Sequence, residues 1–275
     1  MTSRRELITS ADNAKLKLVR RLQRRRDPRL FVAEGEDLLA AARDAGRSPE
    51  LVLVAAGSGL EGIEVEPSLL AAASALGSGT RAIGVFERRW AEAPAGPLCV
   101  ALWGVGDPGN VGTILRSALA FGAASVALGP GCADPYGPKA VRASMGAVFT
   151  VPLARWGEGA GETAAPPPAD ATRAAETAPP PADAARAAET ASPPADAARA
   201  LAALPRPTVA LAARAGEPLR GPLPEGSLLV GAEREGLPDE VVAACDRVAH
   251  VPIRSESLNA AMAATVALYE AVRYN

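Results

Sequence analysis

The chain has 275 residues, a formal net charge of −2, three cysteines and one histidine. This length suffices for one large domain or two modest ones, and the charge excludes a protein that is basic throughout. Cys99, Cys132 and Cys245 are odd in number and far apart, which argues against a disulfide framework and a cysteine-bound metal. The single histidine, His250, argues against a histidine zinc site and a histidine general base. We therefore expect no bound metal.

No stretch of about 18 apolar residues is present, and the N-terminus lacks the pattern of a signal peptide. We therefore expect a cytoplasmic protein that does not enter a membrane.

The N-terminal segment concentrates positive charge. The first 30 residues hold ten Lys or Arg residues and only three acidic ones. Residues 10–26 have helical periodicity, with Leu18 and Leu22 on one side. Basic residues occupy the rest of its surface: Lys15, Lys17, Arg20, Arg21, Arg24 and Arg25. Such a helix predicts an arm that contacts RNA or DNA, and the alternative is a solvated basic face without a partner.

Strands and helices then alternate. We predict strands at 31–33, 51–55 and 81–86 and helices at 34–46 and 67–76. This alternation predicts a small α/β domain over about 28–89. With the basic helical arm it forms an N-terminal domain over residues 1–90, and 91–97 (AEAPAGP) form a linker.

A second alternating series begins at residue 98. We predict its strands at 98–103, 125–128, 148–151, 208–212, 228–232 and 248–253. Its helices are predicted at 111–121, 139–145, 197–204, just after Pro238, and along the apolar C-terminus. These elements predict a larger α/β domain over residues 98–275.

A low-complexity segment interrupts this second domain. Residues 157–200 contain no Leu, Ile, Val, Met or aromatic residue, and from 165 they repeat with a 13-residue period (APPPADATRAAET, APPPADAARAAET). Since the segment has nothing to bury, it cannot offset the entropy cost of ordering. We predict a mostly disordered insertion over 157–196.

The turn after the strand at 98–103 begins a candidate ligand site. Asp107 or Asn110 is placed to cap the helix that follows, whose free N–H groups favour a polar or anionic ligand. Arg116 falls between apolar residues of that helix, so we expect it on the buried side with a partner. The glycines of 104–109 have dinucleotide-binding spacing, but the next strand does not end in the acidic residue that such a site needs. A nicotinamide or flavin enzyme is therefore disfavoured.

Polar residues recur where predicted strands end. Asn110 and Arg116 follow the strand at 98–103, Glu233 follows 228–232, and Ser257 and Asn259 follow 248–253. Each alone has an ordinary explanation as a cap, an ion-pair residue or a turn residue. Together they are expected to converge at the carboxyl edge of one sheet, where open α/β sheets bind ligands.

These segments resemble the SpoU (or TrmH) family of RNA ribose 2′-O-methyltransferases, of the SPOUT class. NVGTILRSALAFGA, RASMGAVFTVP, LLVGAEREGLPDEV and VPIRSESLNAAMAATVALYE follow the order of the family motifs. FVAEGEDLLAAA resembles the substrate-binding domain of many members. Two features differ from the usual motifs: Ala232 replaces an asparagine, and the loop 253–256 is short and lacks glycine.

The resemblance implies a C-terminal domain with a trefoil knot, a homodimer with the active site near the subunit interface, and S-adenosylmethionine as cofactor. It places Asn110, Arg116, Glu233, Ser257 and Asn259 in the active site. Apolar walls and close backbone approach for the adenine would come from Leu229, Gly231, Ile253 and Leu258.

The implied reaction is 2′-O-methylation of RNA. A guanidinium is a poor base because its pKa exceeds about 12, so we expect Arg116 to anchor phosphate and stabilise alkoxide charge, with Glu233 holding Arg116 or a nearby loop. A separate N-terminal domain favours 23S ribosomal RNA as substrate by analogy. The alternatives are transfer RNA, or a non-catalytic RNA-binding or ribosome-assembly factor on the same fold.

Overall fold

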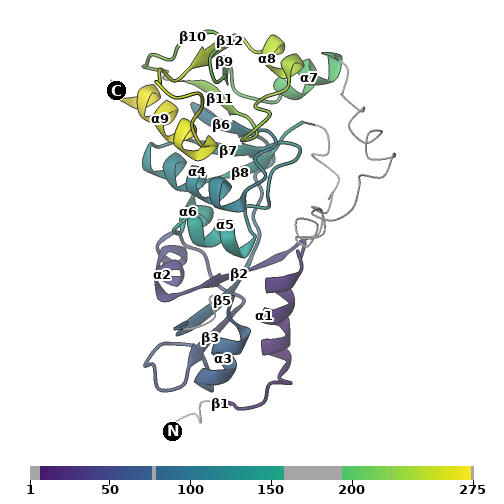
Figure 1. Ribbon diagram of the computed structural model, residues 1–275. Helices are drawn as coiled ribbons and strands as arrows, with labels where there is room; N and C mark the ends of the chain where they lie inside the picture. Colours follow the sequence, from purple (N-terminus) through teal and green to yellow (C-terminus); the bar gives the residue numbers. More distant parts are fainter. Residues whose placement is uncertain (1–6, 76–78, 158–193, 224, 274–275) are drawn as a thin grey trace, which may run out of the picture.

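In a computed structural model, the described residues are 7–75, 79–157, 194–223 and 225–273. They form two sheets that follow one another along the length of the molecule (Figure 1). The first sheet has five strands in the order β1-β4-β3-β5-β2, and the second has seven in the order β10-β12-β9-β11-β6-β7-β8.

The first sheet is mixed. Strands β1, β4 and β3 run parallel to one another, whereas β5 is antiparallel to both β3 and β2. Its strands are β1 (Leu7–Ile8), β2 (Leu30–Glu34), β3 (Leu51–Ala55), β4 (Ile63–Val65) and β5 (Ala82–Glu87). Its helices are α1 (Ala14–Arg24), α2 (Glu36–Asp44) and α3 (Pro67–Ala73).

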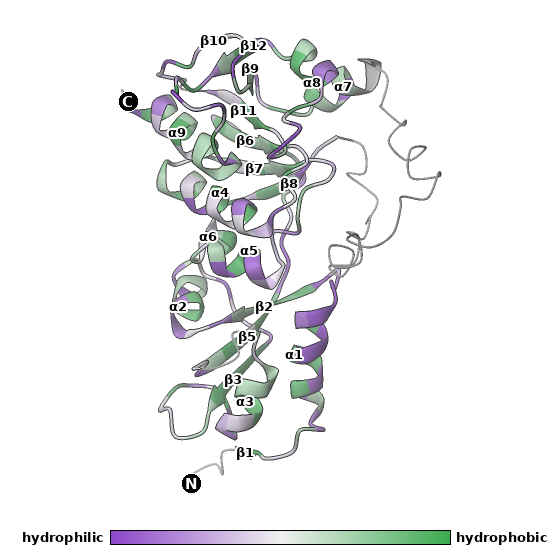
Figure 2. Ribbon diagram, in the orientation of Figure 1, coloured by the Kyte–Doolittle hydropathy of each residue, from purple (hydrophilic) through white to green (hydrophobic). Residues whose placement is uncertain are grey.

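Helix α1 packs on this sheet and is an integral part of it. Leu16, Val19 and Leu22 are buried against sheet residues such as Leu53 and Val85. The polar residues of α1 lie on its outer side, and Figure 2 shows the hydrophilic character of the helix. The basic residues are therefore presented outward by a fixed helix.

The second sheet is parallel throughout. Its strands are β6 (Leu98–Leu102), β7 (Ser125–Leu128), β8 (Leu153–Arg155), β9 (Thr208–Leu211), β10 (Glu217–Pro218), β11 (Gly226–Val230) and β12 (Arg247–His250). Its helices are α4 (Pro108–Ala120), α5 (Pro138–Ala143), α6 (Ala147–Thr150), α7 (Pro194–Leu201), α8 (Asp239–Ala244) and α9 (Ala260–Val272).

Helices cover both faces of this sheet, and alternate residues of each central strand explain why. In β6, Val100 and Leu102 pack toward α4 and α9, whereas Cys99 and Ala101 pack toward α7 and α8. Burial on both faces is typical of a parallel sheet and explains the continuous apolar run in the sequence. Figure 1 shows the two helix pairs on opposite sides.

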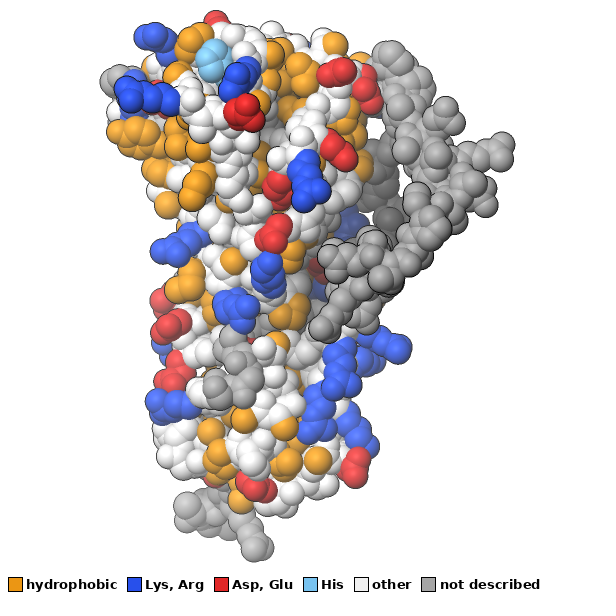
Figure 3. Space-filling view, in the orientation of Figure 1, with side chains coloured by type: hydrophobic (Ala, Val, Ile, Leu, Met, Phe, Trp, Pro, Cys, Tyr) orange, Lys and Arg blue, Asp and Glu red, His pale blue; other side chains and the backbone are white. Residues whose placement is uncertain are grey.

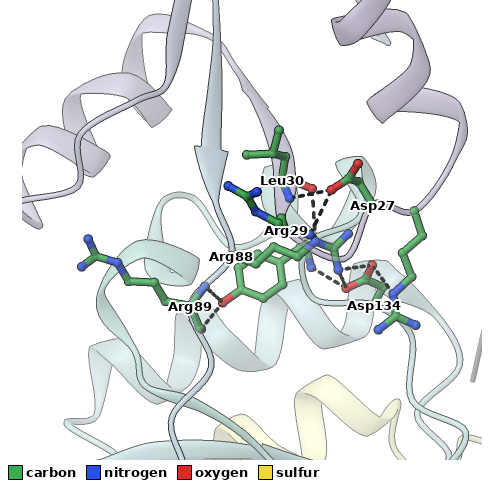
Figure 4. Close-up of polar contacts among 8 residues, drawn as sticks. Asp27, Arg29, Leu30, Arg88, Arg89 and Asp134 are labelled. Atoms are coloured by element: carbon green, nitrogen blue, oxygen red, sulfur yellow. Dashed lines mark hydrogen bonds and ion pairs between the residues drawn. The ribbon is translucent and has the colours of Figure 1, made fainter. Parts of the chain in front are cut away.

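One hydrophobic cluster joins the two sheets. Phe31 of β2 lies with its ring centroid 4.8 Å from that of Tyr136, and Phe86 of β5 lies 4.8 Å from Phe149 of α6. Polar contacts reinforce this junction (Figure 4): the Arg88 guanidinium donates to both carboxylate oxygens of Asp134, at 2.9 and 3.1 Å. Since Arg88 is only 4% exposed, this ion pair is buried.

Most predicted elements are confirmed with shifted ends, and one is wrong. The strand predicted at 148–151 is the helix α6, and the strand β8 begins two residues later. An apolar run buried on all sides has no periodicity that separates strand from helix. Gly146 permits the close packing of α6 on α2, because a Cβ there would lie 2.4 Å from the Ala41 Cβ. The short strands β1, β4 and β10 were not predicted.

The predicted insertion lies mostly outside the described residues, which exclude 158–193. Its predicted end is too late, since α7 begins at Pro194. Ala197 and Leu201 of α7 are buried beside Trp156 and Val241, so the end of the third repeat belongs to the core. None of the described helices is both long and apolar enough to cross a bilayer.

Candidate active site

Helix α4 begins directly above the carboxyl end of β6. Asp107 is its N-cap, and the carboxylate accepts hydrogen bonds from the backbone N–H groups of Gly109 and Asn110 at 2.6 and 3.1 Å. Of the two predicted caps, Asp107 takes this role, so the Asn110 side chain is not needed as the cap and can make other contacts. The Lys139 ammonium donates to Asp107 at 2.9 Å and holds the pKa of that carboxyl below its usual range.

Three of the predicted polar residues form a continuous hydrogen-bonded chain. The Asn110 amide donates from Nδ2 to Oε1 of Glu233 at 2.7 Å. The Asn259 amide donates from Nδ2 to Oδ1 of Asn110 at 3.0 Å. Asn259 also caps α9, since its Oδ1 accepts from the N–H groups of Ala261 and Met262. We call Asn110, Glu233 and Asn259 the amide–carboxylate cluster.

The sheet order explains how these distant residues meet. Strands β6 and β11 are adjacent and parallel, while the chain continues from β6 to β7 on the other side. The carboxyl edge between β6 and β11 is therefore a topological switch point, where open sheets bind ligands. Asn110 follows β6 and Glu233 follows β11, so the predicted convergence at this edge is observed for Asn110, Glu233 and Asn259.

A cavity of about 370 Å³ opens beside the cluster. Gly231, Ile253, Leu258, Glu233 and Ser257 line it, so three predicted cofactor residues and two predicted catalytic residues share one hollow. Its volume falls within the range of about 300–1,000 Å³ that is usual for small-molecule sites. Other lining residues, which were not predicted from the sequence, lie at the ends of β9 and β11 and in the loops that follow them: Leu211, Ala213, Val230 and Leu237.

Leu229, which was also predicted to bind the cofactor, lies outside this cavity. It is fully buried between the sheet and the helices α7 and α8, and it does not line the cavity. Because side chains alternate along a strand, the cavity is lined instead by its neighbour Val230. A strand buried on both faces gives no sequence signal of which residue faces the ligand.

Gly231 is required by a close backbone approach. A Cβ at this position would lie 2.2 Å from the carbonyl carbon of Gly236. The loop between them is closed by two hydrogen bonds of 3.0 Å that Ala232 and Gly236 exchange. A Cβ on Gly104 would lie 3.1 Å from the Ala232 Cβ, so glycine at 104 lets this loop approach the turn after β6 closely.

Arg116 does not lie where it was predicted. Its side chain is exposed on α4, and in the described part of the chain it makes no ion pair with Glu233 or any other residue. Six residues separate it from Asn110, which places it about 9 Å along the helix and on a different side. The expectation of burial is wrong. Of the two contacts considered for Glu233, Arg116 or a nearby loop, the structure shows a contact with Asn110 at the start of α4 instead of one with Arg116.

A cysteine nucleophile is not available near the site. Cys132 is in the loop after β7, and burial raises the pKa of its thiol to about 11. The thiol is therefore protonated at neutral pH, and the thiolate is the reactive form. No cluster of His, Cys, Asp and Glu that would hold a metal occurs among the described residues.

Comparison with known proteins decides the family. Residues 97–269, the part that carries the cavity and the cluster, match the SpoU rRNA Methylase family. The chain belongs to this family. The matched region thus contains every strand of the second sheet and ends within α9.

Curated SpoU relatives match parts of the chain. A segment of 57 residues is 51% identical to mouse mitochondrial rRNA methyltransferase 3, covering 21% of this chain and 14% of that protein. A longer match, 33% identical over 175 residues, is to the 23S rRNA (uridine(2479)-2′-O)-methyltransferase of Streptomyces viridochromogenes. It covers 61% of this chain and 49% of the relative. The chain thus matches about half or less of these relatives.

A solved structure matches along nearly the full length of both chains. It is an AdoMet-bound rRNA methyltransferase from Sinorhizobium meliloti, with 27% identity and a TM-score of 0.73. The alignment covers 98% of each chain. The similarity therefore extends to the N-terminal sheet, beyond the SpoU region itself.

The basic residues predicted to bind RNA lie on α1 or, for Arg25, at its C-cap, and they differ in their partners. Arg24 and Arg25 are exposed, with no partner in the described part of the chain. Lys17 pairs with Asp12 at 3.0 Å, Arg21 pairs with Asp27 at 3.5 Å, and Arg20 donates to the Ala11 carbonyl. The unpaired charge is therefore greatest at the C-terminal end of α1.

Proposed function

We propose that this SpoU chain transfers a methyl group from S-adenosylmethionine to a ribose 2′-hydroxyl of RNA. The observation that best supports this proposal is that the amide–carboxylate cluster lies beside a cavity lined by Gly231, Ile253 and Leu258. The related AdoMet-bound rRNA methyltransferase supports the same cofactor here.

The lining of the cavity suits the chemistry of S-adenosylmethionine. Ile253 and Leu258 supply apolar walls for an adenine, and Gly231 lines the cavity while permitting the close approach of the backbone at Gly236. Bound there, the cofactor supplies an already activated methyl group. The protein then has to align the ribose oxygen and handle one proton.

Glu233 is the group that we assign to the hydroxyl proton. Its Oε1 is occupied by Asn110, while its Oε2 has no hydrogen-bond partner among the described residues. Glu233 lines the cavity, so Oε2 is available to accept a hydrogen bond from the 2′-hydroxyl and to orient its oxygen. Ser257, on the same wall, supplies a further hydroxyl for the ribose.

Arg116 serves as an anchor for substrate phosphate and for developing alkoxide charge. Its planar guanidinium is always charged and binds phosphate through two parallel hydrogen bonds. Since it points away from the cluster of its own chain, we assign it to the active site of a partner subunit.

We propose a homodimer, in which Arg116 of one subunit would reach the active site of the other. An apolar face on α4 and α9 is exposed: Leu119 is 42%, Met262 61%, Val266 37% and Tyr269 50% exposed. Figure 3 shows hydrophobic side chains gathered over this part of the molecule. Arg116 lies one turn from Leu119 on the same helix, so a partner on this face would be beside it. We define Leu119, Met262, Val266 and Tyr269 as the α4–α9 face.

The proposal also covers the knot of the methyltransferase domain and the role of the N-terminal unit. We infer a trefoil knot in the loops that follow β9, β11 and β12, which line the cavity, and an RNA-binding role for the N-terminal unit over residues 1–90. The linker at 91–97 joins this unit to the methyltransferase domain. We also propose that the protein acts in the cytoplasm.

Ribosomal RNA is the proposed substrate class, and 23S rRNA the specific one. The Streptomyces relative is named a 23S rRNA 2′-O-methyltransferase, and the similarity to an rRNA methyltransferase covers both sheets. The test is to map 2′-O-methyl groups in RNA from cells with and without this gene. Loss of one site in 23S rRNA is expected, whereas loss of a transfer RNA site would change the substrate.

Calorimetry with S-adenosylmethionine separates an enzyme from a non-catalytic RNA-binding factor on the same fold. Binding to one site per chain is expected from the lining of the cavity. Absence of binding would contradict catalysis by this site.

A further inference from the structure

Helix α5 connects the candidate active site to the N-terminal sheet. In its first turn, the Lys139 ammonium bonds to Asp107, the cap of α4, and the Lys139 Cε lies 3.4 Å from the place of a Cβ on Gly109. In its last turn, Arg142 lines a small hollow with Val32 and Glu34 of β2. One short helix thus touches both parts of the molecule.

Lys139 and Arg142 share the outer side of α5. Residues three apart on a helix are neighbours on its surface. The inner side packs on α4, where a Cβ on Gly112 would lie 2.3 Å from the Ala140 carbonyl oxygen. The Lys139 side chain is 56% exposed, and Arg142 is exposed as well. Both charges therefore face solvent.

Arg142 has no partner to explain its position. In the described part of the chain it makes no hydrogen bond or ion pair. The nearby Glu34 carboxylate already accepts from the side chains of Gln23, Ser74 and Thr80. An exposed guanidinium beside an occupied carboxylate is free to bind an anion in solution.

The basic end of α1 leads to this helix. Arg26, just after α1, lies 3.4 Å from Asp134, which precedes α5 by four residues. Arg24 and Arg25 are exposed at the same end of α1. Figure 3 shows Lys and Arg side chains over α1 and over α5 on one face of the molecule. Basic side chains thus lie at the C-terminal end of α1, on α5 and, through Lys139, beside the first turn of α4 that carries Asn110.

We propose that Lys139 and Arg142 bind backbone phosphates of the RNA and lead the strand from α1 to the amide–carboxylate cluster. The inference rests on the proposed function, because that function makes a polyanionic RNA the substrate. Lys139 and Arg142, one turn apart on α5, then fix the position of the RNA backbone between α1 and the amide–carboxylate cluster. Phosphate contacts of this kind position a nucleic acid without reading its sequence.

The test is the salt dependence of RNA affinity for the full chain. The probe is a fluorescently labelled single-stranded RNA of mixed sequence, titrated at several salt concentrations. For Arg142→Ala, the slope of log affinity against log salt is expected to flatten by about 0.7, the value for one phosphate contact with a single strand. Lys139→Gln is expected to flatten it by a similar amount.

Arg220→Ala is the matched control, because Arg220 is exposed and lies beside the C-terminal end of α9, away from α5. Its slope should equal that of the wild type. Unchanged slopes in both α5 variants would overturn the proposal, as would equal flattening in the control. Affinity for S-adenosylmethionine is expected to be the same in all variants, and a parallel loss would instead indicate a structural role.

The result also separates this inference from the proposed function. If the α5 variants flatten the slope but the wild-type chain transfers no methyl group, RNA binding along α5 stands and the proposed reaction fails.

Discussion

Asn110 and Glu233 are 123 positions apart in the chain, yet the amide of one donates a 2.7 Å hydrogen bond to the carboxylate of the other. Asn259 fixes the direction of this contact, since its own amide donates to Asn110. Its oxygen is in turn held by two N–H groups at the start of α9. The carboxylate is thereby oriented by two helix N-termini, and its second oxygen remains available to substrate.

The two asparagines are expected to act as one unit in catalysis. Asn110→Ala and Asn259→Ser should each slow methyl transfer by roughly thirtyfold, about 2 kcal/mol of barrier. The double variant should be about as slow as either single one, because breaking the chain once already releases Glu233. Serine keeps the cap of α9 while removing the amide. Single-turnover rates at saturating S-adenosylmethionine measure this, and additive losses would contradict it.

Arg116→Ala should reduce methyl transfer at least about a hundredfold, or about 2.7 kcal/mol of barrier, while cofactor binding persists. The reason is that Arg116 lies outside the cavity that we assign to the cofactor. Arg116→Lys should fail almost as badly, since lysine is a point charge without a planar pair of donors. Transfer rates and calorimetry test both statements. Recovery by lysine would show that positive charge alone suffices.

The buried ion pair at the junction of the two sheets is expected to matter for stability. Arg88→Ala leaves Asp134, which is 12% exposed, with one remaining cation and should cost roughly 3 kcal/mol in the free energy of unfolding. Arg29→Ala is the control, because the Arg29–Glu87 pair is exposed and should contribute less than about 1 kcal/mol. Urea unfolding measures both. Equal effects would show that the junction does not depend on this contact.

A charge on the α4–α9 face is expected to disrupt a dimer. Val266→Lys places an ammonium in the middle of the exposed apolar side of α9, and burying it in an interface would be costly. Sedimentation should show the wild type at twice the mass of this variant. Ala203→Lys adds the same charge at an exposed position on the opposite side of the sheet and should leave the mass unchanged. A monomeric wild type would contradict the dimer.

The fold was largely predictable where local signals agree. Apolar runs bounded by glycine and proline marked β6, β7 and β11, and the polar residues after them predicted convergence at one sheet edge. The strand predicted at 148–151 is wrong because α6 is buried on all sides, so that its apolar residues show no period. Burial on both faces of β11 also hid that Val230, rather than Leu229, lines the cavity.

Other features depend on tertiary contacts that leave little local trace. Arg116 was expected on the buried side because its sequence neighbours are apolar. In the structure its side chain is exposed on α4, so apolar neighbours in the sequence do not fix which way a helical residue faces. The core shared by Phe31, Phe86, Tyr136 and Phe149 joins residues from both sheets, and no periodicity within one segment predicts it.

The most direct test of the central claim is to identify the product. The chain is incubated with unmodified 23S rRNA and S-adenosylmethionine labelled in its methyl group, and the RNA is digested to nucleosides. The account predicts that the label is found in a single 2′-O-methylnucleoside and is lost with Glu233→Ala. Label in a base-methylated nucleoside, or no transfer by a chain that binds the cofactor, would contradict it.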